Sequence, residues 1–418
     1  MQYIIKAPRH INTSIKLPAS KSISNRALII HAQTGGSIVP GNLSDCDDTE
    51  VIINALRDMP EVIDIKAGGT AMRFMTAYLA TLKGHEHIIT GTERMQHRPI
   101  SVLVNALRYL GADIEYVKEE GFPPLRIRGN ELEGGYVEMQ GNVSSQFISA
   151  VLLIGPNLRN GLELKLKGNI ISRPYIDLTL WMMNEFGADA NWTGSDTVTV
   201  KPQPYMQRDY LIENDWSAAS YWFEAMALAA DVDSQINLSG LMDGSKQGDS
   251  VVRYLYSMLG VKTSFESKEE GTPTTVTLKK SRRVVPRLDY DFINSPDLAQ
   301  AVVVTCCALG IPFHFRGLAT LKIKETNRIA ALKTELRKLG FVIKDQNDSE
   351  LIWDGERCSP TMEPIDTYED HRMAMSFAPL ALVFDEIAIN NPEVVTKSYP
   401  NYWSDMTAAG FEITEVNP

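Results

Sequence analysis

One pattern recurs along this chain: an amphipathic stretch ends on a glycine and continues directly into alternating, strand-like residues. The glycines of the pattern are Gly111, Gly187, Gly260, Gly340 and Gly410. A glycine after the last helical residue commonly adopts the left-handed cap conformation, so that a strand can begin without a long loop. In a sixth, imperfect copy the helix reaches Met59 and a proline takes the place of the glycine. The pattern predicts six structural units.

A second series of helices alternates with the first and is apolar on nearly every face. These helices begin in the segments 20–27, 68–74, 143–150, 215–221, 295–301 and 369–375. A helix that is apolar all round is expected to be buried. Each unit should then hold one buried helix, one surface helix and strands between them, which is an α/β repeat. A generic α/β protein whose helices share similar caps is the alternative, and six parallel occurrences favour the repeat.

Polar and charged residues gather at the N-termini of the apolar helices. The strongest case is residues 17–26, where Lys21 and Arg26 are interleaved with Ser20, Ser22 and Ser24. A helix N-terminus offers free N–H groups and the positive end of the helix dipole, so cations there favour an anion site. An ordinary capped helix with solvated Lys and Arg is the alternative. If all six units point the same helix end inward, the groups converge on one anion-binding cleft.

Length and charge limit the classes of protein that fit. The 418 residues favour two domains or more, and a break is expected near residues 211–214. A net charge of −11 argues against nucleic acid as the main partner, because nucleic-acid binding needs a basic stripe. An anionic small molecule remains compatible, since a local basic pocket can lie within an acidic protein.

The cysteines and the N-terminus indicate a cytoplasmic protein. Cys46, Cys306, Cys307 and Cys358 form no C-x-x-C pair, which predicts reduced, buried thiols. The spacing of His, Cys, Asp and Glu predicts no metal site. The first residues show neither a signal-peptide nor a transit-peptide pattern, and no apolar run reaches membrane-spanning length.

Several motifs together resemble one known family. They occur in family order over nearly the whole chain, at residues 17–26, 69–73, 98–100, 143–146, 172–177, 296–297, 323–328, 368–375 and 397–400. On these motifs the chain resembles the EPSP synthases (5-enolpyruvylshikimate-3-phosphate synthases), members of the enolpyruvyl transferase family. Each motif alone is moderately specific, and the ordered set is very specific.

The resemblance implies a fold and a domain organisation. The fold is the α/β enolpyruvyl transferase-like inside-out barrel, with two lobes of three βαβαββ units each around buried central helices. The N-terminal lobe would span residues 21–213, and the C-terminal lobe would combine residues 1–20 with 214–418. The active site is expected in the cleft between the lobes.

The resemblance also implies a reaction. The enolpyruvyl group of phosphoenolpyruvate is transferred to the 5-hydroxyl of shikimate 3-phosphate, which gives EPSP and inorganic phosphate by addition and elimination. This step belongs to the shikimate pathway, which leads to chorismate and the aromatic amino acids. The expected protein is a cytoplasmic monomer that uses these two substrates without cofactor, metal, nucleic acid or membrane. Its response to glyphosate is not predicted.

By family position, three groups of residues form the site. Shikimate 3-phosphate would be bound by Lys21, Ser22, Arg26, Ser144, Ser145, Gln146, Ser172, Asp297 and Lys324. Phosphoenolpyruvate would be bound by Lys21, Gly69, Arg98, Gln146, Arg328, Arg372 and Lys397. Asp297 is expected to act as the base toward the 5-hydroxyl, with Glu325 and Lys21 as proton carriers. A simple salt bridge from Glu325 to Arg328 along one helix is the alternative for Glu325, and the two roles are compatible.

The chain departs from the family pattern at a few positions, and other residues argue against rival readings. Asn327 stands where an aspartate is usual, and Ala67, Phe74 and Thr320 also depart from common choices. The related transferase that acts on UDP-N-acetylglucosamine would show Lys-Asn in the opening motif and a loop cysteine, whereas this chain has Lys21-Ser22 and no cysteine between Cys46 and Cys306. A non-catalytic anion-binding protein on the same fold would be expected to lack Lys21, Asp297 or Glu325. All three residues are present.

Overall fold

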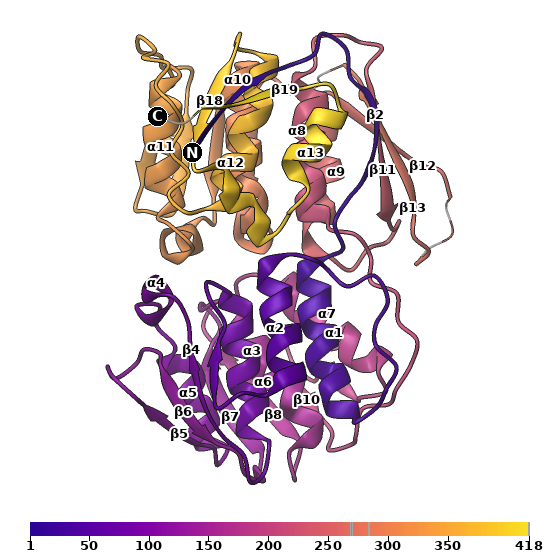
Figure 1. Cartoon of the computed structure of the whole chain (residues 1–418), viewed down its shortest axis with the longest axis vertical. Helices are drawn as coiled ribbons and strands as arrows, with labels where there is room; N and C mark the ends of the chain where they lie inside the picture. The colour runs from indigo at the N-terminus through magenta and orange to yellow at the C-terminus, as the bar shows by residue number, and fades with distance from the viewer. Residues whose placement is uncertain (268, 270, 283–284, 417–418) are drawn as a thin grey trace. The chain divides into compact units, whose positions relative to one another are not determined.

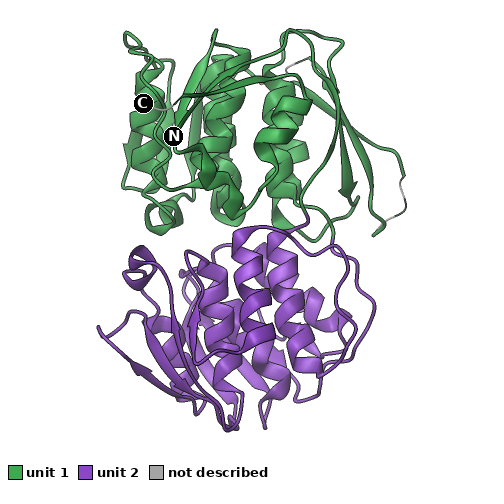
Figure 2. Cartoon of the chain, in the orientation of Figure 1, with its two compact units in different colours: residues 1–18, 213–418 green, residues 19–212 purple. Residues whose placement is uncertain are grey.

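The computed structural model describes residues 1–267, 269, 271–282 and 285–416, so the last two residues of the expected C-terminal lobe lie outside it. The chain divides into two compact units (Figure 2). Residues 1–18 and 213–418 form one, here called the C-terminal unit, and residues 19–212 form the other, the N-terminal unit. The architecture is α/β throughout.

Four sheets share one topology, in which the first two strands are parallel and the fourth strand pairs antiparallel between the second and the third. In the N-terminal unit these sheets are β3(Val62–Asp64), β4(Glu86–Thr90), β5(Asp113–Tyr116) and β6(Leu125–Arg128), then β7(Gly135–Gln140), β8(Leu162–Lys167), β9(Ala190–Trp192) and β10(Thr197–Val200). In the C-terminal unit they are β2(Asn12–Lys16), β11(Gln235–Leu241), β12(Val261–Phe265) and β13(Thr274–Lys280), then β14(Leu288–Asp291), β15(Phe313–Arg316), β16(Lys344–Gln346) and β17(Glu350–Trp353). The repeated order is that of a βαβαββ unit.

The fifth sheet has the same order but borrows its last strand from the N-terminus. It contains β18(Ile387–Asn390), β1(Gln2–Lys6) and β19(Glu412–Val416), with β1 antiparallel to both neighbours. A single parallel bridge from Ile365 to Ile389 marks the position of the missing first strand. The first residues of the chain therefore complete a sheet formed by the last ones.

The sixth unit has helices but no sheet among the described residues. It contains α1(Lys21–Thr34) and α2(Asp47–Asp58). In place of paired strands, the described residues of this unit have a single parallel bridge between Gly41 and Leu211. The segment between the two helices, residues 35–46, is mostly exposed and rich in Gly, Ser and Pro. Such residues favour turns over a paired strand.

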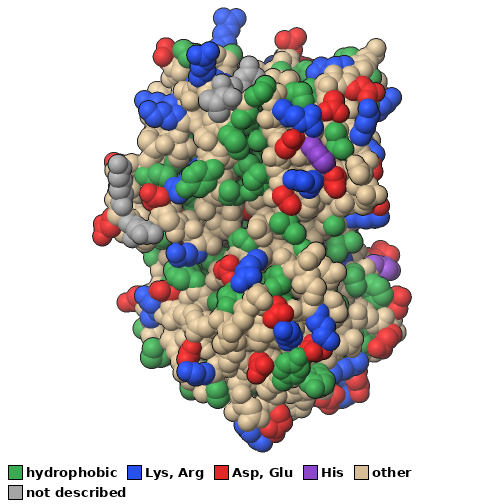
Figure 3. Space-filling model, turned by 180° about the vertical axis from the view of Figure 1, so that it is seen from behind, with side chains coloured by type: hydrophobic (Ala, Val, Ile, Leu, Met, Phe, Trp, Pro, Cys, Tyr) green, Lys and Arg blue, Asp and Glu red, His purple; other side chains and the backbone are tan. Residues whose placement is uncertain are grey.

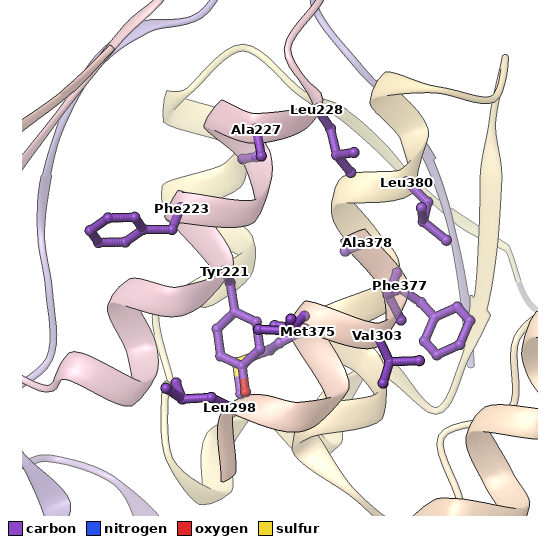
Figure 4. Close-up of a cluster of buried hydrophobic side chains, with 14 of the residues drawn as sticks. Tyr221, Phe223, Ala227, Leu228, Leu298, Val303, Met375, Phe377, Ala378 and Leu380 are labelled. Atoms are coloured by element: carbon purple, nitrogen blue, oxygen red, sulfur yellow. The ribbon is translucent and has the colours of Figure 1, made fainter. Parts of the chain in front are cut away.

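The apolar helices form the interiors of both units, as their sequences predicted. In the N-terminal unit they are α1, α3(Gly69–Ala80) and α6(Ser145–Ile154), and in the C-terminal unit α8(Trp216–Leu228), α10(Ala299–Leu309) and α12(His371–Phe377). The helices α8, α10 and α12 lie side by side (Figure 1). Figure 4 shows side chains from these three helices in one core, among them Tyr221, Val303 and Met375.

Six other helices of the described chain have one buried and one exposed face. They are α2, α5(Ser101–Tyr109), α7(Arg173–Glu185), α9(Val252–Ser257), α11(Arg328–Lys338) and α13(Tyr402–Ala408). The five glycines that end such helices all have positive φ, between 84° at Gly187 and 106° at Gly111. In the imperfect copy, Met59 itself adopts the left-handed conformation at φ 39° and its N–H caps Ala55 O. The predicted helix ends at the five glycines are confirmed, and the copy without glycine also ends where the sequence predicted.

The surface mixes charges of both signs. Acidic and basic side chains are interspersed over the face seen in Figure 3. Among the described helices, none combines the length and the apolar character that crossing a bilayer requires. All four cysteines are free thiols; Cys46, Cys306 and Cys307 are buried, whereas Cys358 is half-buried, which corrects the expectation that every thiol is buried.

One buried carboxyl group lies in the core of the C-terminal unit. Glu224 of α8 has no exposed surface. Burial raises the pKa of its carboxyl well above the ordinary 4.5, and the Thr305 hydroxyl offsets this effect only in part. Burial therefore favours the neutral, protonated form of this carboxyl in the folded protein.

A neutral buried acid makes stability depend on pH. The pKa of Glu224 is higher in the folded protein than in the unfolded protein. The free energy of unfolding is therefore largest below the unfolded-state pKa. It falls by about 1.4 kcal/mol per pH unit as pH rises from the unfolded-state pKa toward the folded-state pKa. Glu224→Gln should remove this loss and stabilise the protein at pH 7 to 8. Urea denaturation from pH 5 to 8 measures the effect, with the exposed Glu412→Gln as control. Parallel pH profiles of wild type and Glu224→Gln would contradict the prediction.

Candidate active site

The expected site residues fall into two groups, one in each unit. Lys21, Ser22, Arg26, Gly69, Arg98, Ser144, Ser145, Gln146 and Ser172 belong to the N-terminal unit. Asp297, Lys324, Glu325, Arg328, Arg372 and Lys397 belong to the C-terminal unit. Each group is described within its own unit.

Lys21 is the first residue of α1, directly after the cap. The Ser20 hydroxyl accepts a hydrogen bond from the Ile23 N–H at 3.4 Å, which fixes the start of the helix. The Lys21 Nζ donates to Asp48 Oδ2 at 3.0 Å, and the Asp48 side chain is only 6% exposed. A buried carboxylate thus orients the ammonium group.

Arg26, one turn further along α1, is a buried cation. Its guanidinium donates to Thr179 Oγ1 at 2.7 Å, to Ser149 Oγ at 3.2 Å and to the carbonyls of Ser22 and Tyr175. Burial lowers its pKa to about 10, so the group still carries its charge at neutral pH. Every one of these acceptors is uncharged. A buried charge whose hydrogen bonds go to neutral groups favours an incoming anion.

Gly69 and Arg98 lie against each other at the start of α3. A Cβ built on Gly69 would lie 2.8 Å from Arg98 Nη1 and 3.1 Å from Nη2, closer than real Cβ contacts allow. Arg98 follows the short helix α4(Glu93–Gln96) and is half-buried. The absent side chain leaves room for the guanidinium at a helix N-terminus, where N–H groups are free.

Ser144, Ser145 and Gln146 form the start of α6. Ser144 is its N-cap and accepts from the Gln146 N–H at 3.4 Å. The Gln146 amide donates to Thr70 Oγ1 at 3.1 Å, which joins the starts of α6 and α3. Ser145 is buried. Gln146 thus contacts the first turn of the helix that Gly69 begins.

Ser172 precedes α7 in an unusual backbone conformation. It is 6% exposed and has φ 53° and ψ 36°, the left-handed region, which a non-glycine residue seldom adopts. Its side chain makes no capping hydrogen bond to the helix. Local strain of this kind persists where the surroundings fix it, often at ligand sites.

In the C-terminal unit, Arg328 is surrounded by carboxylates. Its side chain is 1% exposed at the start of α11, where Asn327 accepts from the Ala330 N–H. The guanidinium bonds to Asp370 at 2.7 Å, to Glu325 at 2.9 Å and to Asp297 at 3.1 Å. Burial alone would lower the pKa of Arg328, but these three carboxylates raise it above its ordinary value. The salt bridge that was the alternative for Glu325 is present, but Glu325 lies before the start of α11, so the pair does not run along one helix.

Asp297 lies in the short helix η4(Pro296–Leu298) among three cations. Its Oδ2 contacts Arg372 Nη2 at 3.1 Å, and its Oδ1 contacts Arg328 Nη1 at 3.1 Å and Lys324 Nζ at 3.6 Å. Burial raises the pKa of Asp297, but Arg372, Lys324 and Arg328 together outweigh burial and hold the pKa well below its usual range. In this state Asp297 is ionised and a weak base.

Lys397 and Arg372 complete the cluster. Lys397, at the end of η7(Pro392–Lys397), lies 3.3 Å from Glu325 Oε1 and is 9% exposed. Arg372, in the first turn of α12, also donates to the Tyr221 hydroxyl at 3.3 Å. Four cations thus share three carboxylates, those of Asp297, Glu325 and Asp370. The residues expected from the C-terminal half are brought together.

Two partners of these cations were not predicted as site residues. Asp48 holds Lys21, and Asp370 holds Arg328 while capping the Arg372 N–H at 2.9 Å. Asp370 lies within the motif at 368–375, close to Arg372, so the sequence alone could have identified it as a site residue. Asp48 is 27 residues from Lys21 and lies in none of the motifs, so the sequence did not identify it. Among the described residues, no group of His, Cys, Asp and Glu is placed to hold a metal ion.

Comparisons with known proteins agree on one family. A profile described as EPSP synthase (3-phosphoshikimate 1-carboxyvinyltransferase) matches residues 58–406. A 3-phosphoshikimate 1-carboxyvinyltransferase of Bacteroides fragilis is 58% identical over 414 residues, 99% of each chain. One of Photobacterium profundum is 34% identical over 427 residues, with 95% of this chain and 96% of the relative covered.

Solved structures show the same fold. EPSP synthase from Acinetobacter baumannii superposes with a TM-score of 0.79 at 21% identity, covering 99% of this chain and 100% of the other. The enolpyruvyl transferase NikO from Streptomyces tendae superposes with a TM-score of 0.71 at 14% identity, covering 99% and 98%. At these identities the likeness concerns the fold, and it identifies the fold class as that of the enolpyruvyl transferases.

Removing one carboxylate from Arg328 should weaken the C-terminal unit. Asp370→Asn keeps the cap on the Arg372 N–H but leaves the buried guanidinium with one charged partner fewer. The expected loss is about 3 kcal/mol, typical of breaking a buried ion pair. Urea denaturation measures it, with the exposed Asp385→Asn as control. A loss no larger than that of the control would contradict a structural role for the pair.

Proposed function

The chain belongs to the EPSP synthase family, and we propose that its residues carry out the family's reaction in the following way. The enolpyruvyl group of phosphoenolpyruvate passes to the 5-hydroxyl of shikimate 3-phosphate, and inorganic phosphate is released. The observation that carries this proposal is the 58% identity with a 3-phosphoshikimate 1-carboxyvinyltransferase over 99% of both chains. The protein acts as a cytoplasmic monomer on these two small substrates, without nucleic acid or membrane.

Shikimate 3-phosphate is bound chiefly by the N-terminal unit. Arg26 brings a buried charge whose acceptors are neutral, which suits a phosphate dianion. The hydroxyls and amide at the starts of α1, α6 and α7 offer short, directional donors to the phosphate and the ring hydroxyls. The residues proposed on this side are Lys21, Ser22, Arg26, Ser144, Ser145, Gln146 and Ser172, with Asp297 and Lys324 from the C-terminal unit.

Phosphoenolpyruvate carries a phosphate and a carboxylate, and both need cations. The residues proposed to bind it are Lys21, Gly69, Arg98, Gln146, Arg328, Arg372 and Lys397. Arg372 and Lys397 are now paired with Asp297 and Glu325. Binding therefore exchanges part of each ion pair for a contact with the ligand, and the proposed reaction requires residues of both units.

This exchange explains how Asp297 becomes a base. While Arg372, Lys324 and Arg328 contact it, its pKa is too low to accept a proton at neutral pH. When the ligand's anionic groups draw the cations away, the pKa rises. Asp297 can then take the proton of the 5-hydroxyl as the oxygen attacks C2 of phosphoenolpyruvate.

The second proton moves at the methylene carbon. Addition requires a proton delivered to C3, and elimination requires a proton removed from C3 as phosphate leaves. Glu325 is 15% exposed and paired with Arg328 and Lys397, and Lys21 is the other proposed carrier. The proton added at C3 is removed again, and the 5-hydroxyl proton passes from Asp297 to the released phosphate, so the two steps balance without a cofactor or metal.

Phosphate release tests the proposed reaction and the role of Glu325 together. Purified protein should release phosphate only when both substrates are present. Glu325→Gln should lower kcat by about 10²- to 10⁴-fold, since a positioned acid or base contributes this much. The exposed Glu363→Gln is the control. A folded protein that binds shikimate 3-phosphate but releases no phosphate would refute the proposed function.

Gly69→Ala tests the contact with Arg98. The new Cβ would lie 2.8 Å from Arg98 Nη1 and displace the guanidinium. We expect the KM for phosphoenolpyruvate to rise about tenfold, the cost of about 1.4 kcal/mol in binding, with a smaller change for shikimate 3-phosphate. Gly194→Ala, where the nearest atom is 3.7 Å away, is the control. An equal rise for both substrates would contradict the assignment.

A further inference from the structure

A buried carboxyl group on α11 lies outside the motifs from which the site was expected. Glu335 has no exposed surface, and both of its oxygens have partners. Its Oε1 accepts from the Tyr368 hydroxyl at 2.6 Å. Its Oε2 accepts from the Asp366 N–H at 3.0 Å and lies 2.7 Å from Lys338 Nζ. Burying a carboxylate is costly unless its partners compensate. Two of these three partners belong to the segment just before α12.

That segment contains two consecutive residues in the left-handed region of backbone conformation. Tyr368 has φ 54° and Glu369 has φ 57°, and neither is a glycine. A Cβ disfavours this conformation, so two such residues in succession persist only where their surroundings hold them. The Tyr368 hydroxyl supplies one such contact through Glu335, and the Asp370 N–H supplies another by donating to Thr367 O at 2.8 Å.

The beginning of the same segment is anchored to the sheet and to α11. Ile365 forms a parallel bridge with Ile389 of β18. The Asp366 carboxylate accepts from the Asn390 amide at 2.8 Å and from Lys338 Nζ at 2.9 Å. Because residues 365 and 366 are fixed in this way, the backbone at residues 368 and 369 determines where the next residue lies.

The next residue is Asp370, which joins the turn to the cation cluster. Its Oδ2 accepts from Arg328 Nε at 2.7 Å, and its Oδ1 accepts from the Arg372 N–H at 2.9 Å. Arg328 is the first residue of α11 and Glu335 follows seven residues later, which places the two side chains on one face of the helix. One face of α11 therefore contacts residues 366–370 at both ends of the turn.

We propose that Glu335 is a positioning residue: by holding the left-handed pair Tyr368 and Glu369, it fixes the place of Asp370. Asp370 in turn orients the two arginines that are proposed to bind phosphoenolpyruvate, so this inference rests on the proposed function. Burial and the bond to Glu335 raise the pKa of Tyr368, so its hydroxyl stays protonated and able to donate. Without that donor the turn relaxes, and Asp370 moves away from both arginines.

Tyr368→Phe tests the proposal with the smallest change, because it removes the hydroxyl and keeps the ring. The KM for phosphoenolpyruvate should rise about threefold to tenfold, the range that one hydrogen bond supports, and the KM for shikimate 3-phosphate by about twofold at most. Tyr136→Phe is the matched control, since the Tyr136 hydroxyl also donates to a glutamate, Glu138, at 2.6 Å, but on β7 of the N-terminal unit. Equal values in Tyr368→Phe and the control, or an equal rise for both substrates, would overturn the proposal.

A rescue variant separates the shape of the turn from a general loss of stability. Glycine adopts positive φ without steric cost, so Glu369→Gly lets the turn keep its shape without the hydroxyl. In the Tyr368→Phe background, this second change should recover most of the lost affinity for phosphoenolpyruvate. Glu369 is exposed, and its replacement cannot restore the missing hydrogen bond, so the recovery would come from the turn itself. A KM that stays raised in the double variant would overturn the proposal.

Amide hydrogen exchange measures the same turn without turnover. In Tyr368→Phe, the peptide that spans residues 366–373 should exchange about threefold to tenfold faster than in wild type. The reason is that the Asp370 and Arg372 N–H groups lose the acceptor geometry that the turn provides. In the Tyr136→Phe control this peptide should exchange as in wild type. Equal exchange in all three proteins would contradict a role of Glu335 in holding the turn.

Phosphate release by wild type, measured alongside, separates this inference from the proposed function. If wild type releases phosphate from the two substrates while KM and exchange are unchanged in Tyr368→Phe, the positioning role is wrong and the proposed function stands. If exchange is faster but KM is unchanged, Glu335 holds the turn for stability alone and the positioning role is also wrong. If wild type releases no phosphate, the proposed function fails, and the exchange rates still decide whether Glu335 fixes the turn.

Discussion

The buried guanidinium of Arg328 determines the arrangement of the C-terminal half of the site. A charge with 1% of its side chain exposed is tolerated only because Asp297, Glu325 and Asp370 surround it. Those carboxylates in turn hold Lys324, Arg372 and Lys397 within reach of one another. The positions of the other ionised groups in this cluster therefore follow from the need to compensate one buried cation.

The N-terminal unit compensates its buried cation in a different way. The hydrogen bonds of Arg26 go to hydroxyls and carbonyls, so an anion can be bound there without breaking an ion pair. In the C-terminal unit, the same event competes with Asp297 for Arg372. The first arrangement suits a group that is bound and left unchanged, such as the phosphate of shikimate 3-phosphate. The second suits the reacting ligand, because in the proposed reaction competition for the cations makes Asp297 basic only when that ligand is present.

The parts of the fold that depend on neighbouring residues could be predicted from the sequence. Strand pairing between distant segments could not. The helix ends at Gly111 and Met59 depend on a few adjacent residues, and both could be predicted from the sequence. The absence of a sheet beside α1 and α2 among the described residues could not be predicted, because strand pairing depends on partners far along the chain. The same limit applies to the site: cations at helix starts could be expected, whereas Asp48, 27 residues beyond Lys21, is placed there only by the packing of α2 on α1.

The route of the chain links these features within the C-terminal unit. Residues 1–18 complete two of its sheets, through β1 between β18 and β19 and through β2 beside β11. Where the chain leaves and returns, the Asp215 N–H donates to Pro18 O at 2.9 Å, and the Asn214 N–H to Gly240 O at the same distance. The returning segment then begins α8, whose first turn holds Asp249 through Ser217. The segments where the chain leaves and returns are thus joined by a backbone hydrogen bond directly before α8 begins.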